Sequence, residues 1–178
     1  MQGEVKVIYD EELDLPDIQF IQNNCVTPWQ RVSSGISEIV PLVIYVRYYL
    51  KPNDLLVIEE PEAHLHPALQ IEVAKLFVAL VNRGVNILLT THSQFLLSSL
   101  NNHIKSAKLK KEEQKEVGLE PLDFRKVSAC LLKQIDGSLY SSYEPLIPDQ
   151  DGISESQFVE IHKQLYEQST MIDYRSDE

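Results

Sequence analysis

The feature that most constrains the fold is the segment 54–93, in which two short apolar runs flank one helical stretch. The first run, 55–58, is rich in branched residues, and the second run spans 85–89. Between them, apolar residues recur every three or four positions after Pro67, which is the period of a helix with one buried face. Proline is favoured at the first helical position. Two apolar strands joined by a helix predict a βαβ unit with parallel strands and a right-handed crossover.

Polar residues follow each predicted strand. Glu59 and Glu60 come directly after the first strand. Thr90, Thr91 and His92 close the second. Because ligands of parallel sheets collect beyond the carboxyl ends of the strands, we expect the two acids and the imidazole to share one rim. The sequence therefore predicts a functional site at this edge of the sheet.

Composition and charge narrow the class of protein. The chain has 178 residues, 43% of them hydrophobic, and a net charge of −11. No apolar run approaches the ~20 residues of a membrane helix, and no signal peptide is visible, so we expect no membrane partner. Two distant cysteines give no disulfide or zinc framework, which favours the cytoplasm. The negative net charge argues against nucleic-acid binding by this chain itself, because such binding needs Lys and Arg to neutralise phosphates. We expect DNA contact only through a larger assembly.

We expect four segments along the chain. Residues 1–32 predict an antiparallel strand pair and a loop. Residues 33–100 hold a helix and the βαβ unit. Residues 101–126 are polar and rich in lysine and glutamate, which predicts a solvated linker. Residues 127–178 predict a hairpin and a last helix, with Asp136-Gly137 as a turn that needs positive φ.

The helix at the start of the second segment is predicted to run from about residue 33 to residue 50. Ser33 and Ser34 suit its beginning, because a serine hydroxyl accepts hydrogen bonds from the N–H groups of the first turn. Pro41 lies inside it and should bend it, since proline frees the carbonyl of Ser37. Capping alone is one reading of Ser34, and it is compatible with a role in binding.

Taken together, these motifs resemble those of ABC-type ATPase heads of the RecF, OLD and structural-maintenance-of-chromosomes (SMC) group, often called AAA-family ATP-binding proteins. Residues 55–61 resemble the Walker B strand, and 63–66 fall where that group has its D-loop. Residues 90–93 resemble its switch-histidine loop, and 33–37 resemble its Leu-Ser-Gly-Gly-Gln signature. The order and spacing of the four agree. The resemblance implies an α/β, P-loop NTPase-like parallel sheet flanked by helices, with a C-terminal hairpin and helix.

The chain also departs from that pattern. Glu59 replaces the usual aspartate, Ile36 replaces a signature glycine, and His66 replaces the D-loop aspartate. The phosphate-cradling loop Gly-x-x-x-x-Gly-Lys-Ser/Thr is absent, because none of the six glycines precedes a lysine. The resemblance therefore implies an incomplete head, a carboxyl-terminal lobe that needs a missing Walker A lobe as its partner.

The resemblance implies ATP and Mg²⁺ as the cofactors of the predicted rim. Glu59 would hold Mg²⁺ through water, because Mg²⁺ sheds its hydration reluctantly. Glu60 would orient and partly deprotonate the attacking water. His92 would hydrogen-bond the γ-phosphate region. The structural alternative for Glu59 and Glu60 is a simple turn after the strand, and that for His92 is a histidine packed in the core.

The same resemblance implies a second subunit. Ser34 and Gly35 lie at the start of the signature helix, whose partial positive charge suits phosphate, and would face the nucleotide bound by the other copy. His66, in the D-loop position, would lie at the same seam. These residues imply a homodimer.

Three functions follow as hypotheses. The first is an ATPase, inactive or weak as this isolated chain, that acts in DNA repair or phage defence, together with a nuclease or other effector. The second is a non-hydrolytic module that dimerises or docks on an effector. The third is a metal-dependent hydrolase that uses Glu62, His64 and His66. His103 and His162 are expected at the surface.

Overall fold

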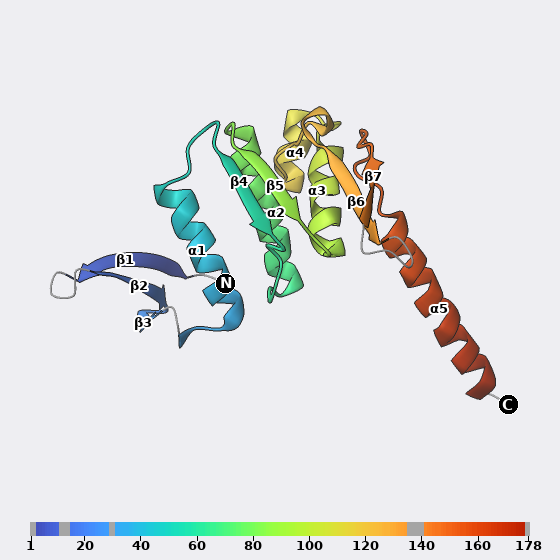
Figure 1. Cartoon of the computed structure of the whole chain (residues 1–178), viewed down its shortest axis with the longest axis horizontal. Helices are drawn as coiled ribbons and strands as arrows, with labels where there is room; N and C mark the ends of the chain where they lie inside the picture. Colours follow the sequence, from blue (N-terminus) through green and yellow to red (C-terminus); the bar gives the residue numbers. More distant parts are fainter. Residues whose placement is uncertain (1–2, 11–14, 29–30, 135–140, 177–178) are drawn as a thin grey trace. The chain divides into compact units, whose positions relative to one another are not determined.

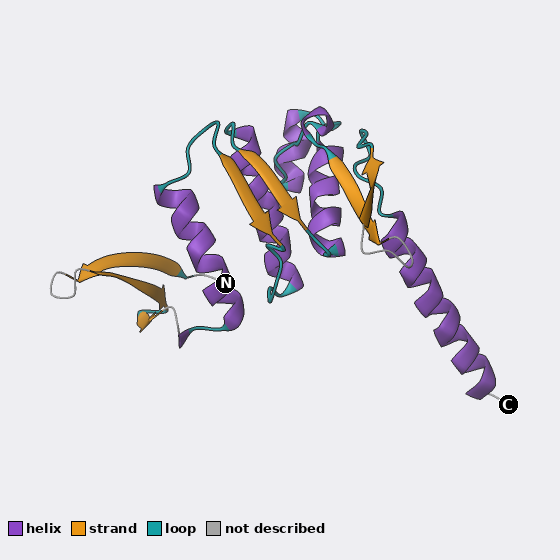
Figure 2. Ribbon diagram, in the orientation of Figure 1, coloured by secondary structure: helices purple, strands orange, loops and turns teal. Residues whose placement is uncertain are grey.

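The computed structural model describes residues 3–10, 15–28, 31–134 and 141–176. They form two compact units, the first made of residues 1–73 and 80–91 and the second of residues 74–79 and 92–178. Figure 1 labels the helices and strands, and Figure 2 colours them by type. No helix among the described residues is long and apolar enough to cross a membrane.

The first unit begins with a three-stranded antiparallel sheet of β1 (Glu4–Asp10), β2 (Leu15–Gln22) and β3 (Cys25–Pro28), in the order β1-β2-β3. The strand pair expected in this region is β1 and β2, whereas β3 occupies residues expected as loop. Asn23 and Asn24 turn β2 into β3 with φ of 49° and 62°. Asparagine tolerates this left-handed conformation, which two-residue hairpins require.

Helix α1 (Ser34–Tyr48) follows, with Ser33 as its N-cap residue. The Ser33 hydroxyl makes no capping hydrogen bond, so the expected serine cap is not formed. Instead the Ser37 hydroxyl donates to the carbonyl of Ser33 at 3.3 Å. Pro41 is accommodated inside the helix, and Val40 before it is almost fully buried, at 1% exposure.

The predicted βαβ unit is confirmed. β4 (Leu55–Glu59) and β5 (Asn86–Thr90) are parallel and in register, and α2 (Pro67–Asn82) connects them. Gly84 ends the connection with φ of 90°, a conformation that costs a glycine little. The expected buried face of α2 is present, with these residues buried: Val73, Ala74, Phe77, Val78 and Leu80.

The two faces of the β4–β5 pair differ in burial. Leu56 is buried at 7% exposure, whereas Leu55, Val57 and Leu88 are 60%, 60% and 58% exposed. Successive side chains of a strand point to opposite faces, so one face of the pair is covered and the other is an open apolar surface. Parallel strands are normally covered on both faces.

The second unit contains the remaining elements: α3 (Gln94–Ser106), α4 (Lys111–Val117), the short helix η2 (Phe124–Lys126), β6 (Ala129–Gln134), β7 (Ser141–Leu146) and α5 (Ser156–Ser176). β6 and β7 pair antiparallel. The predicted turn at Asp136-Gly137 lies outside the described residues. The region expected as a polar linker holds the last turns of α3, all of α4 and η2.

One expectation in this region is wrong. His103 is not at the surface but 1% exposed, in α3. Its Nδ1 lies 2.6 Å from the carbonyl oxygen of Glu120, and the N–H of Leu122 donates to the carbonyl of His103 at 3.0 Å. The segment after α4 therefore packs on α3 and covers the imidazole.

A buried amide fixes the segment that leads into α5. The Asn101 side chain donates to the carbonyl of Ile153 at 2.9 Å and to the Glu155 carboxylate at 2.7 Å, and it accepts from the N–H of Ile153 at 2.8 Å. Ser98 donates to the same carboxylate at 2.7 Å. Gly152 lies so close that an added Cβ would fall 2.3 Å from Asn101 Oδ1. Only glycine fits there.

Candidate functional site

The site is built on the carboxyl ends of β4 and β5. Glu59 and Thr90 are the last residues of these strands and pair with each other in the parallel register. Glu60 follows β4, and Thr91 follows β5. The carboxylates of Glu59 and Glu60 belong to exposed residues. The structure thus brings both predicted acids to the edge of the sheet where the second strand also ends.

Glu60 has an unusual backbone that hydrogen bonds hold in place. Its φ is 43°, a left-handed conformation that costs a residue with a side chain about 1–3 kcal/mol. Its N–H donates to the carbonyl of Thr90 at 3.0 Å and lies 3.3 Å from the Thr90 hydroxyl oxygen. Its carbonyl accepts from the N–H of Ala63 at 2.9 Å. Such strain persists where the surroundings fix it, and it is typical of functional sites.

A side-chain hydrogen bond makes a second tie between the two strand ends. The Thr91 hydroxyl donates to Oε1 of Glu62 at 2.6 Å, and both residues are half-buried. Sequence reasoning placed Thr91 at the end of the second strand, but it did not identify the bond between Thr91 and Glu62. The pairing joins residues 29 positions apart, so no local pattern could have shown it.

The donors at this rim fit Mg²⁺ better than a transition metal. Mg²⁺ binds through one or two carboxylates together with phosphate oxygens and waters. Glu59 and Glu60 offer carboxylates on consecutive exposed residues. In the part of the chain that the structure describes, no group of three or more His, Cys, Asp and Glu side chains is arranged to hold a metal ion. The hypothesis of a metal-dependent hydrolase therefore receives no support.

His66 has a structural role that sequence reasoning missed. Its Nδ1 accepts from the N–H of Ala68 at 3.3 Å, at the start of α2. His66 therefore caps the helix that Pro67 opens. Its predicted place at a subunit seam stays a prediction.

The segments 33–37 and 63–66, which were predicted to be the signature and the D-loop, lie next to each other. A Cβ added to Gly35 would lie 3.2 Å from the carbonyl oxygen of His64, so the backbones approach closely there. His64 itself has φ of 60°. Ser34 is exposed at the first position of α1. The binding roles predicted for Ser34 and Gly35 stay predictions.

His92 directly follows Thr91 in the chain and is exposed. The next residue, Ser93, caps α3, because its hydroxyl accepts from the N–H of Leu96 at 3.1 Å. The loop 90–93 therefore runs from the strand end into a capped helix. The contact between His92 and a phosphate stays a prediction.

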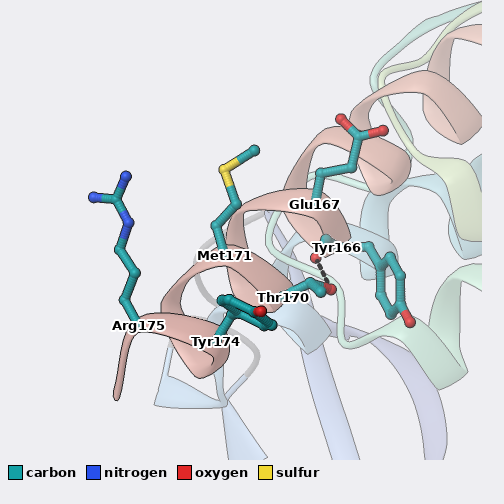
Figure 3. A pocket seen from close by; sticks show the side chains of 6 residues that line it. All are labelled: Tyr166, Glu167, Thr170, Met171, Tyr174 and Arg175. Atoms are coloured by element: carbon teal, nitrogen blue, oxygen red, sulfur yellow. Dashed lines mark hydrogen bonds between the residues drawn. The ribbon is translucent and has the colours of Figure 1, made fainter. Parts of the chain in front are cut away.

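The structure also has a hollow on α5, away in sequence from the residues of the candidate site. Figure 3 shows the side chains of one exposed helix that line it: Tyr166, Glu167, Thr170, Met171, Tyr174 and Arg175. The dashed line marks the Thr170 hydroxyl, which donates to the carbonyl of Tyr166 at 2.9 Å. None of these residues was predicted as a site residue, and we assign no catalytic role to the hollow.

Comparisons with known proteins identify a family and a fold. Residues 3–97 match the family model of the AAA ATPase domain. None of the curated proteins compared with the chain matches it.

Two solved structures resemble the fold. A chain from structural work on ATP-driven dimerization and DNA-stimulated activation of SMC ATPases matches with a TM-score of 0.59 at 15% identity, over 92% of this chain and 81% of that chain. An SMC head bound to the C-winged helix domain of ScpA matches with a TM-score of 0.54 at 14% identity, over 82% of this chain and 37% of that chain. Identities this low show a likeness of fold.

Proposed function

Because this chain belongs to the AAA ATPase domain family and has the fold of an SMC-type ATPase head, we propose that it supplies the acid and histidine side of an ATP-hydrolysing site. The observation that supports this most is the tie from Glu60 N–H to Thr90. It holds two carboxylates at the end of β4 while the chain continues from β5 towards His92.

The proposed roles follow from the positions of the side chains. Glu59 would hold Mg²⁺ through water, and the bound ion would neutralise charge on the phosphates. Glu60 orients the attacking water and accepts its proton. His92 donates a hydrogen bond to the γ-phosphate region. Phosphoryl transfer relies on positioning and on charge stabilisation, so an incomplete site turns over slowly.

The open apolar face of the β4–β5 pair supports a partner that carries the missing phosphate loop. Leu55, Val57 and Leu88 are more than half exposed, although strands of this kind are normally covered on both faces. We propose that the partner covers this face with a helix that runs antiparallel to the strands and has its N-terminus at the rim of Glu59 and Glu60. A helix N-terminus binds phosphate, and its lysine-bearing loop balances the acidic rim.

We also propose that two copies pair through the signature and D-loop segments. Gly35 and the His64 carbonyl lie close enough to form one continuous surface, with Ser34 and His66 beside them in sequence. The matched SMC ATPases undergo ATP-driven dimerization. In this arrangement Ser34 and Gly35 face the nucleotide held by the other copy.

We propose that ATP hydrolysis by this protein drives DNA repair or phage defence in the cytoplasm. The protein would act there with a nuclease or another effector. The matched SMC head binds a winged-helix domain of another protein, which illustrates how such a head acquires an effector. Because DNA binding needs cationic side chains and this chain has a net charge of −11, we propose that other parts of a larger assembly make any DNA contact.

The experiment compares the isolated chain with the same chain completed by a phosphate-loop lobe, in wild-type, Glu60→Gln and Glu116→Gln forms. Glu116 lies exposed on α4 and controls for loss of one carboxylate. We expect weak ATP binding and little turnover by the isolated chain. In the completed protein, Glu60→Gln should abolish turnover and Glu116→Gln should not. Equal inactivity of all completed forms would favour the non-hydrolytic docking module. Robust turnover by the isolated chain would refute the need for a partner lobe.

A further inference from the structure

We propose that Glu62 and Thr91 form a clamp that positions the catalytic rim, a role that rests on the proposed ATPase function. The name rim clamp is used below for this pair. Glu62 lies two residues after Glu60, in the turn that leaves β4, and Thr91 lies immediately before His92. The clamp therefore joins the turn that carries the proposed water-orienting acid to the loop that carries the proposed phosphate-contacting histidine.

The geometry of the bond indicates a strong interaction. The Thr91 hydroxyl donates to Glu62 Oε1 at 2.6 Å. Hydroxyl donors to ionised carboxylates give distances of about 2.5–2.7 Å, shorter than those between neutral groups. Both partners are half-buried, which limits competition from water. Glu62 thus acts as a hydrogen-bond acceptor for the neighbouring strand end.

The clamp complements the backbone tie of Glu60. The N–H of Glu60 is held by the Thr90 carbonyl at 3.0 Å while its φ stays at 43°. The backbone bonds fix the first residue of the turn, and the side-chain bond of Glu62, two residues later, ties the turn to the other strand end. Glu62 and Thr91 are positioning residues, since they act through Glu60 and His92.

The expected kinetic effect follows from this role. A displacement of about 1 Å at a reacting group can lower a rate about 100-fold. Loss of the clamp in the completed ATPase should therefore lower kcat by about 10- to 100-fold and leave the KM for ATP nearly unchanged. Glu60→Gln should abolish turnover instead.

The clamp is tested by nuclear magnetic resonance on the chain itself, which needs no activity. Thr91→Val removes the hydroxyl at nearly constant shape, and Thr91→Ser keeps it. Thr170→Val is the matched control, because the Thr170 hydroxyl donates to a carbonyl within the exposed helix α5. We expect Thr91→Val to shift the Glu60 amide and the His92 ring signals and to speed amide exchange at Glu60. Thr91→Ser should restore both, and Thr170→Val should change neither.

A second variant tests the clamp from its other side. Glu62→Ala removes the acceptor and should move the His92 ring signals as Thr91→Val does. Shifts confined to the turn 60–63 would overturn the proposal, as would unchanged Glu60 exchange in Thr91→Val. A completed wild-type protein without ATPase activity would refute the proposed function, while these resonance measurements would still decide the clamp.

Discussion

At the scale of single residues, the site depends on a conformation that its side chains do not favour. Glu60 has φ of 43° and is followed in the same turn by His64 at 60°. Residues other than glycine rarely adopt such angles, and they do so where surrounding bonds fix them. Here the carbonyl of Thr90 provides the fixing bond at 3.0 Å. Stability has been given up at the position proposed to carry the chemistry.

The strain at Glu60 predicts a trade between stability and function. Glu60→Gly should be more stable than Glu60→Gln by about 1 kcal/mol, because glycine adopts a positive φ without steric cost. Both variants lack the carboxylate and should lack ATPase activity. Unfolding in urea measures the difference. A glycine variant less stable than the glutamine variant would show that the turn is unstrained.

Asp123 predicts a local pH dependence in the second unit. Hydrogen bonds from the Arg125 side chain, and then from the Arg125 backbone N–H, lower the pKa of the Asp123 carboxyl to about 2. A lowered pKa stabilises the fold above the unfolded value near 4, and that contribution disappears as the pH falls from about 4 to about 2. Carboxyl resonances measured against pH should show this titration. Arg125→Gln should raise the pKa, and Lys126→Gln should raise it less.

At the scale of elements, the sequence predicted the structures that depend on local patterns and missed those that depend on contacts between distant residues. The βαβ unit was predictable because two apolar runs and a three-and-four period are local signals, and its parallel register is confirmed. Strand β3 also has a local signal, because Asn23-Asn24 suits the positive φ angles of a two-residue hairpin. The burial of polar residues at the end of α3 could not be predicted in this way. Asn101 and His103 are polar, and their burial depends on partners such as Glu155, 54 residues away from Asn101.

The Asn101 network predicts a large effect from one amide. Asn101→Ala leaves Ile153 and Glu155 without their buried partner, which should lower the free energy of unfolding by about 2–3 kcal/mol. Asn102→Ala is the matched control, because Asn102 is the exposed neighbour on the same helix, and it should change stability by less than about 0.5 kcal/mol. Chemical denaturation of both variants makes the comparison. Equal effects would show that the network adds nothing beyond helix formation.

At the scale of the whole molecule, sequence reasoning predicted only part of the candidate site. The positions of Glu59 and Glu60 followed from strand polarity, which a sequence shows. The capping role of His66 and the Thr91–Glu62 bond depend on side-chain geometry that a sequence does not show. The sequence contains no phosphate-loop motif, and we propose that a partner with that loop binds on the open face of β4 and β5.

The open face predicts where a partner lobe binds. Val57→Lys puts a charge on an exposed position of that face, and Leu132→Lys does the same on β6, where Leu132 is 69% exposed. Neither should change the stability of the isolated chain by more than about 0.5 kcal/mol. Val57→Lys alone should abolish association with a phosphate-loop lobe in analytical ultracentrifugation. Association that survives Val57→Lys would place the partner elsewhere.

The most direct test of the central claim is where a metal–nucleotide complex binds. Manganese, a paramagnetic substitute for Mg²⁺, is added with ATP in small amounts to the isotope-labelled chain, and the broadening of each amide signal is measured. We expect selective broadening at Glu59, Glu60, Thr91 and His92, none at Thr170, and loss of the effect in Glu59→Gln. Broadening elsewhere in the chain, or the same pattern with manganese alone, would contradict an ATP site at this rim.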